Sequence, residues 1–255
     1  SSVVMGIAVG CVAAGLSGAN MIFGYFMVPE SLPKEKRTPL TWSKVNPFAA
    51  LIRLASRKDL GGLIAVFALV SFAQVLLHAT YVLYTNFRLG WGTKENGIAL
   101  FCVGLTAAVV QAGLLGRLLK IFGEVKLAMI GLASGAIVYT LYGLATTTWM
   151  MYLFILINLL SYAAPPALQS IVSKATDPKE QGALMGSLQS IGSLATVVTP
   201  LVGATMLAKV SHLPPSDWRI GSVFFLCGLL QTIACVIAWQ YFKSHNLAAP
   251  AAPPA

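Results

Sequence analysis

The sequence predicts an all-α polytopic membrane protein. Of its 255 residues, 57% are hydrophobic and only 10% are charged, and the mean hydropathy is +0.78. A soluble domain carries about a quarter charged residues and must present polar groups to water, so this composition excludes a soluble globular domain. In addition, seven apolar runs are each long enough to cross a bilayer, which takes roughly 20 helical residues.

These runs are apolar on all sides instead of alternating between apolar and polar residues, as 66–70 and 153–157 illustrate. That pattern favours spanning helices over the strands of a transmembrane barrel. The first run has no basic start and no small-residue cleavage site, so we interpret it as a span and not as a secretory signal. The predicted spans cover about 3–28, 62–87, 97–116, 125–145, 149–173, 182–208 and 220–242.

The Lys and Arg residues between the spans predict the orientation. Alternate connections place 13 of them on one side of the membrane and 4 on the other. By the positive-inside rule the side with 13 is cytoplasmic, and the C-terminus lies on that side. Residue 1 then lies outside. We expect from this that the chain is a fragment of a longer protein, lacking its front half.

The segment 29–61 is expected to be a central cytoplasmic loop. Its first part, 29–45, is rich in Pro and Lys and is typical of a linker. Asn46 and Pro47 then form a helix start. The helix that follows, 46–60, is amphipathic and either lies on the membrane surface or connects the spans in solvent. Residues 243–255 are expected to be a disordered cytoplasmic tail.

Polar side chains within spans are costly, so each one invites a functional interpretation. Gln74 and His78 are four residues apart and share a helix face. They either line a solute cavity or bond to a neighbouring helix. The other deep amides commonly bridge helices, and of these Gln169 and Gln189 are the better pathway candidates because both stand beside unusual backbone; the full set is Gln111, Asn158, Gln169, Gln189 and Gln231.

Prolines mark two expected helix breaks. Pro165 and Pro166 together remove two amide donors, and Pro200 is expected to bend the following span. Interrupted helices at membrane depth recur at transport sites, but a static packing kink gives the same pattern.

Sequence signatures of catalysis are missing. There is no Ser/His/Asp set, no paired carboxylates, no HExxH and no phosphate loop, and the four cysteines lack metal-ligand spacing. We therefore expect no enzyme, no cofactor and no metal site. Because the basic residues form no continuous face, nucleic acid is not an expected partner either. The expected partners are the lipid bilayer and a small-molecule solute.

Several runs together resemble one family. Residues 23–33, 111–126 and 166–201 are similar to the end of span six, the loop between spans eight and nine, and spans ten and eleven of drug:proton antiporters in the major facilitator superfamily. Within that superfamily the chain resembles the tetracycline-resistance (TCR/Tet) efflux branch. The resemblance covers about residues 10–242.

This resemblance implies a major facilitator fold in which the seven spans are the family's sixth to twelfth. Residues 62–242 would form the C-terminal six-helix bundle, with inverted repeats 62–145 and 149–242, and the missing N-terminal half would be a partner. It implies proton-coupled efflux of drug-like molecules across the bacterial inner membrane by alternating access. The substrate-pathway candidates are then Gln74, His78, Gln111, Gln169 and Gln189, and a cytoplasmic gating loop at 117–126 contains Gly116, Arg117, Gly123, Glu124 and Lys126.

The sequence departs from the family pattern at four positions. Tetracycline pumps carry a histidine in span eight and an aspartate in span nine, where this chain has Ala107 and Gly135. In the loop motif, Lys120 and Ile121 replace an acidic residue and an arginine. A proton-carrying carboxylate is therefore expected in the preceding half. An uptake carrier and a membrane scaffold without transport remain the alternative functions.

Overall fold

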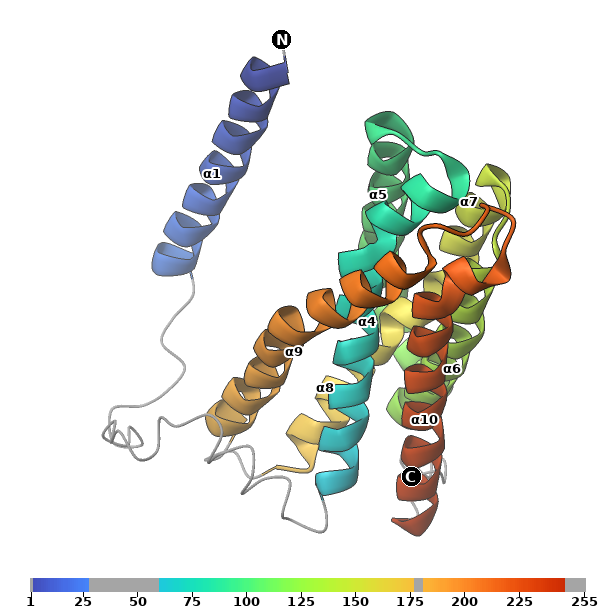
Figure 1. Ribbon diagram of the computed structural model, residues 1–255. Helices are drawn as coiled ribbons and strands as arrows, with labels where there is room; N and C mark the ends of the chain where they lie inside the picture. The colour runs from blue at the N-terminus through green and yellow to red at the C-terminus, as the bar shows by residue number, and fades with distance from the viewer. Residues whose placement is uncertain (1, 28–59, 177–180, 246–255) are drawn as a thin grey trace. The chain divides into compact units, whose positions relative to one another are not determined.

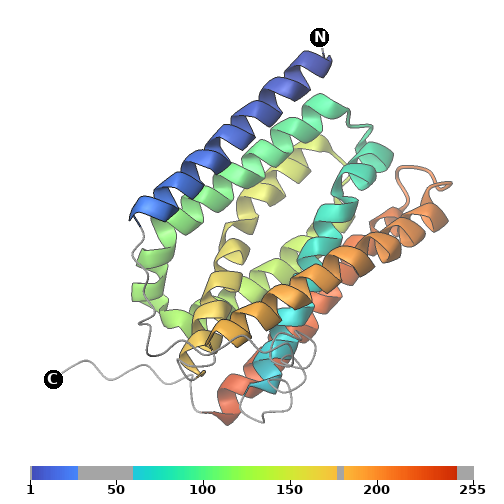
Figure 2. The same cartoon turned by 90° about the vertical axis from the view of Figure 1, so that its left-hand side faces the viewer.

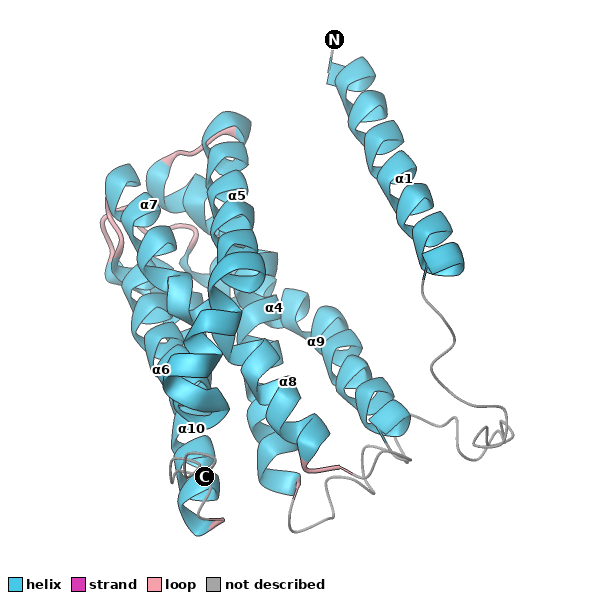
Figure 3. Ribbon diagram, turned by 180° about the vertical axis from the view of Figure 1, so that it is seen from behind, coloured by secondary structure: helices cyan, strands magenta, loops and turns pink. Residues whose placement is uncertain are grey.

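The computed structural model describes residues 2–27, 60–176 and 181–245, and these residues form helices joined by short connections, with no strand among them (Figure 3). The chain divides into two units, the first containing helix α1 and the second containing all the other helices. The predicted surface helix at 46–60 lies outside the described residues except for its last position, and so does the predicted tail from residue 246 onward.

Helix α1, Ser2–Met27, forms the first unit and coincides with the first predicted span. Its 26 residues extend about 39 Å, more than the roughly 30 Å hydrocarbon core. Large apolar side chains such as Leu16, Tyr25 and Phe26 are exposed on it. Such a surface is suited to lipid and not to water.

The second unit is a helix bundle (Figures 1 and 2). The chain passes from one end of the bundle to the other several times, and each such passage is called a crossing below. Some crossings change helix type part-way, with a π-helical segment η2 before α6 and a 3-10 segment η3 between α7 and α8. Its elements are α4 (Gly61–Leu89), α5 (Thr93–Ala108), η2 (Val109–Leu114), α6 (Leu115–Leu144), α7 (Thr148–Ile157), η3 (Asn158–Ala163), α8 (Ala164–Lys174), α9 (Gln181–Val210), η4 (Trp218–Gly221) and α10 (Ser222–Ser244).

Among the described residues of this bundle, five stretches are long and apolar enough to cross a membrane. One of them, Thr93–Leu144, has 52 residues, enough for two crossings. It turns at Gly123, whose φ of 73° lies in the left-handed region that glycine adopts without strain. The bundle therefore makes six crossings. The predicted loop at 117–126 is helical apart from this turn, because the chain reverses within one residue.

The proline-marked breaks differ from each other in the structure. Helix α7 already ends at Ile157, upstream of Pro165 and Pro166, which occupy the first turn of α8 where a missing amide hydrogen is harmless. Pro200 lies inside α9, which continues through it to Val210, so the predicted bend there does not end the helix. Next to it, the Thr199 hydroxyl donates to the Ala195 carbonyl at 2.8 Å, which satisfies this polar side chain within the helix.

Helix α10 packs against both α4 and α6, while α9 packs along α4. The apolar core forms two main clusters, one around Leu63, Leu168 and Leu184 and the other around Tyr84 and Phe224. Many large apolar side chains instead point out of the bundle, among them Phe101, Ile137, Leu156, Val197, Leu201 and Trp239. In water this surface would aggregate, but in a bilayer it meets lipid tails. The protein is an integral membrane protein with an all-α fold.

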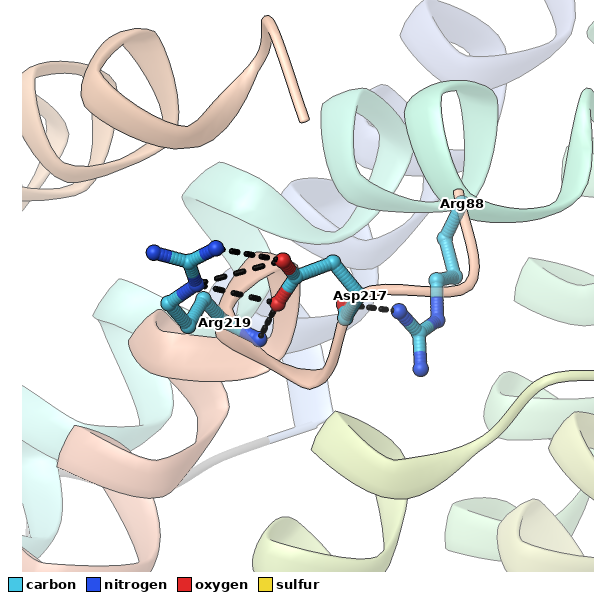
Figure 4. Close-up of polar contacts among 3 residues, drawn as sticks. All are labelled: Arg88, Asp217 and Arg219. Carbon is cyan, nitrogen blue, oxygen red and sulfur yellow. Dashed lines mark hydrogen bonds and ion pairs between the residues drawn. The ribbon is translucent and has the colours of Figure 1, made fainter. Parts of the chain in front are cut away.

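The bundle has two distinct ends. At the Arg88 end, where α4 finishes and α5, α7 and η4 begin, Arg88 donates to the backbone carbonyl of Ala145. It also donates to the backbone carbonyl of Asp217, as Figure 4 shows. At the Glu124 end, where α8 finishes and α9 begins, the Glu124 carboxylate pairs with Lys174 at 2.7 Å. Alternate connections between the helices therefore lie at the same end of the bundle. The prediction of orientation from the Lys and Arg residues requires this arrangement.

Candidate functional site

A pocket opens in the bundle between α4, α5, α6 and η3. It is a small hollow with about 20 Å³ of space for water-sized groups. Its lining is mostly aromatic and aliphatic with a few polar groups, a composition typical of small-molecule sites. The lining residues are Gln74, Leu77, His78, Tyr81, Leu100, Val103, Tyr139, Tyr142, Asn158 and Tyr162.

Helical spacing explains why these side chains converge. On α4, Gln74, His78 and Tyr81 are separated by four and three residues and so lie on one face. On α6, Tyr139 and Tyr142 are three residues apart. Asn158 opens the 3-10 segment at the point where α7 ends. The break in that crossing therefore supplies a polar side chain to the pocket wall.

The tyrosine rings hold one another in place. Tyr142 lies 6.5 Å, centroid to centroid, from both Tyr81 and Tyr139, edge-on to the first and stacked with the second. Tyr81 also meets the ring of Trp91 edge-on at 6.5 Å. Such pairs add stabilisation beyond their buried area, so this wall is largely fixed before a ligand arrives.

Two buried polar atoms of the pocket residues have no hydrogen-bond partner within the described part of the chain. They are the Tyr81 hydroxyl and the Asn158 Oδ1 atom. Their residues are only 4% and 3% exposed, so the bulk solvent does not replace the missing partner.

The structure brings together only two of the five predicted pathway residues, Gln74 and His78. The other three are exposed and do not line this pocket. Gln111 lies in η2, and Gln169 directs its Nε2 atom to the Met185 sulfur at 3.3 Å. Gln189 is exposed on α9.

Sequence reasoning missed the four tyrosines and did not select Asn158. A signal for Tyr81 was present, since it continues the Gln74–His78 face by three residues. The pocket residues on α6 and η3 reach the pocket because separate helices pack together. The spacing of residues along one helix does not predict how that helix packs against another.

Among the predicted gating residues, Glu124 makes contacts within the bundle. Glu124 Oε1 accepts hydrogen bonds from the Ser170 hydroxyl and the Lys174 ammonium, both at 2.7 Å. These contacts tie the start of one crossing in α6 to the end of α8 within the same bundle. Arg117 and Lys126 are exposed, as is Gly116.

Gly135 has no room for a larger side chain. A Cβ atom there would lie 2.8 Å from Gln231 Nε2 and 3.0 Å from the Ser161 hydroxyl oxygen. Gln231 is 1% exposed and belongs to α10. Its amide therefore fills the space next to the backbone of residue 135.

Outside the spans, Asp217 is the acidic partner at the Arg88 end (Figure 4). Its carboxylate accepts hydrogen bonds from the Arg219 side chain, the shortest at 2.7 Å, and from the Arg219 backbone amide. These hydrogen bonds hold the pKa of the Asp217 carboxyl below its usual range. The carboxylate is thus occupied by Arg219, while Arg88 uses the Asp217 carbonyl.

The sequence model of the Major Facilitator Superfamily matches residues 98–254. The chain belongs to the major facilitator superfamily. As a member, it is 30% identical over 215 residues to tetracycline resistance protein class C of Escherichia coli, covering 84% of this chain and 54% of that protein. It is also 30% identical over 185 residues to the class G protein of Vibrio anguillarum, covering 72% and 47%.

A solved superfamily structure shares this fold. The crystal structure of the human organic anion transporter MFSD10 (TETRAN) superposes with a TM-score of 0.69 at 24% identity, covering 87% of this chain and 54% of that one. The matches confirm the resemblance to the tetracycline-resistance branch. The chain spans about half the length of the curated relatives that it matches.

Proposed function

We propose that this chain is the C-terminal part of a proton-coupled exporter of drug-like small molecules. The observation that carries the proposal is the pocket that gathers Gln74 and His78 beside tyrosine rings in a major facilitator bundle. The tetracycline-resistance relatives favour export over uptake. Together they support a membrane transporter, and they do not favour a scaffold, for which a pre-formed solute pocket has no use.

The mechanism we propose is alternating access. The bundle at 62–242, built from repeats 62–145 and 149–242, rocks against a preceding bundle and exposes the pocket to one side of the membrane at a time. The lining side chains contain no carboxylate. The proton that drives export is then carried by carboxylates of the preceding bundle, with His78 as the titratable group on this side of the pathway.

We place the protein in the bacterial inner membrane with the Glu124 end in the cytoplasm. Helix α10 finishes at this end, so the C-terminus lies on the same side. Basic side chains gather here, and they would face the side that the positive-inside rule assigns to Lys and Arg; those in the described residues are Arg117, Lys120, Lys126, Lys174 and Lys243.

The test is efflux of ethidium and Hoechst 33342 from cells that express the full-length gene. We expect His78→Ala to reduce the efflux rate at least tenfold at equal expression, because it removes a polar group from the pocket. His212→Ala is the matched control, since His212 is exposed in the connection before η4 and should leave the rate unchanged. Unaltered efflux in His78→Ala would remove the pocket from the pathway. Transport by the 255-residue chain expressed alone would refute its being one part of a larger transporter.

A further inference from the structure

The turn at Gly123 carries large apolar and basic side chains together on its surface. Ile121 is 72% exposed and Phe122 is 40% exposed, directly before the turn. Exposed basic residues lie on both sides of them in the sequence. We propose that this region, the turn surface, binds an anionic phospholipid through its phosphate headgroup and the upper part of its acyl chains. The turn surface consists of Arg117, Lys120, Ile121, Phe122 and Lys126.

The length of α6 brings the turn to the membrane boundary. Beyond Gly123 the helix continues to Leu144, and at 1.5 Å per residue this part is about 31 Å long. The hydrocarbon core of a bilayer is roughly 30 Å thick. A crossing that matches the core in this way ends at the level of the headgroups. Ile121 and Phe122 then meet the upper acyl chains, and the long basic side chains reach the phosphates.

Packing holds the turn surface in place. Leu118 and Leu119 lie between its basic residues in the sequence, and both pack against a buried apolar cluster that includes Val110 and Leu127. This part of α6 is therefore fixed on the bundle by its apolar face. The opposite combination, exposed apolar side chains flanked by Lys and Arg, is the composition of protein segments that lie in the headgroup region.

The basic side chains of the turn surface have no acidic partner. Within the described part of the chain, no hydrogen bond or ion pair engages the side chain of Arg117, Lys120 or Lys126. Glu124 is the one carboxylate of α6, and it already pairs with Lys174 at 2.7 Å. Three cations are thus left for an external anion. Anionic lipid headgroups attract Lys and Arg at the membrane surface by about 1 kcal/mol for each residue.

The Arg88 end provides an internal comparison. Trp149 begins the α7 crossing at this end and is 64% exposed, as is usual for an aromatic side chain at a membrane boundary. The basic groups here are already engaged, because Arg88 donates to backbone carbonyls and Arg219 pairs with Asp217. This end should therefore contact lipid without preferring an anionic headgroup.

Spin-labelled lipids can measure which headgroup gathers at the turn. All four cysteines of the chain are changed to alanine, and Ile121→Cys is labelled with the fluorophore bimane in phosphatidylcholine nanodiscs. Quenching by 5-doxyl phosphatidylglycerol, which is anionic, is compared with quenching by 5-doxyl phosphatidylcholine at the same mole fraction. We expect phosphatidylglycerol to quench at least threefold more effectively at position 121. At Trp149→Cys the two lipids should quench equally.

Charge variants test the basic residues directly. Arg117→Gln combined with Lys120→Gln should lower the threefold preference to about equal quenching. Lys94→Gln combined with Lys209→Gln is the matched control, since it removes two exposed cations from the Arg88 end and should leave the preference unchanged. Arg117→Lys combined with Lys120→Arg keeps both charges and should keep the preference. Phe122→Ser should weaken quenching by both lipids, because it removes an apolar contact with the acyl chains.

Equal quenching by the two lipids at position 121 would overturn the inference, and so would a preference that survives the Gln substitutions. A fluorophore that neither lipid quenches would show that protein covers the turn surface, which would also overturn it. Lipid binding requires only that the chain lies in a bilayer. Failure here would therefore leave the export function to its own efflux test, which probes the pocket and not the turn.

Discussion

The two ends of the bundle are held together by different interactions. At the Arg88 end, a guanidinium that is only 5% exposed donates to two backbone carbonyls, and the Tyr84 hydroxyl donates to the Tyr142 carbonyl at 2.8 Å. At the Glu124 end, a carboxylate pairs with an ammonium on Lys174, whose side chain is 70% exposed. The first set is sheltered from water and salt, and the second is not.

This difference indicates which end of the bundle yields more easily. A buried charged donor that satisfies backbone carbonyls is expensive to remove, because its partners are left without a hydrogen bond. A solvent-exposed ion pair contributes little and is screened by salt. Connections at the Arg88 end should therefore stay together as the bundle moves, while those at the Glu124 end can separate and rejoin at small cost.

The largest expected effect comes from Arg88→Met, which keeps an apolar stem and removes the guanidinium. We expect the free energy of unfolding in micelles to fall by about 3 kcal/mol, since two carbonyls lose a charged donor. Arg219→Met is the matched control at the same end. Its ion pair with Asp217 is exposed, so the loss should stay below about 1 kcal/mol. Equal losses in the two variants would contradict a buried anchor at Arg88.

The second prediction compares one glycine at each end. A Cβ at Gly221 would overlap the Gly143 backbone carbonyl where η4 crosses α6, so Gly221→Ala should destabilise the protein by about 2 kcal/mol. A Cβ at Gly116 meets nothing within 4 Å, and Gly116→Ala should stabilise the helix by about 0.5–1 kcal/mol. Urea unfolding monitored by far-UV circular dichroism measures both. A neutral Gly221→Ala would show that the Arg88 end is not tightly packed.

The smallest effect is expected at the Glu124–Lys174 pair. A double-mutant cycle with Glu124→Gln and Lys174→Met should give a coupling energy of about 0.5 kcal/mol at low salt. At 1 M salt the coupling should vanish, because the screening length is then about 3 Å. A coupling above about 2 kcal/mol that persists in high salt would make the two ends alike.

Much of the fold was predictable because lipid imposes a simple rule on a spanning helix. Twenty apolar residues must form one, so runs such as 62–87 and 182–208 led directly to α4 and α9. The exact positions at which helices end were harder to predict from the sequence. Pro165 and Pro166 indicated a break, but α7 ends eight residues before Pro165, and α9 continues through Pro200.

The candidate site was predictable only along a single helix. Gln74 and His78 were found because one helix face connects them. Asn158 and Tyr139 reach the same pocket from η3 and α6, and that convergence is set by interhelical packing. The exposure of Gln111 and Gln169 likewise depends on which neighbours cover them, and polarity alone does not reveal it.

The most direct test of the central claim, that the pocket lies on the solute pathway, is alkylation of a single cysteine at His78. The full-length transporter is placed in membrane vesicles with Cys11, Cys102, Cys227 and Cys235 changed to alanine. His78→Cys is labelled with a maleimide in the presence and absence of ethidium, and Lys209→Cys at the exposed end of α9 is the control. We expect ethidium to slow labelling at position 78 at least threefold and to leave position 209 unchanged. Equal labelling rates at position 78 with and without ethidium, in vesicles that still transport it, would contradict the account.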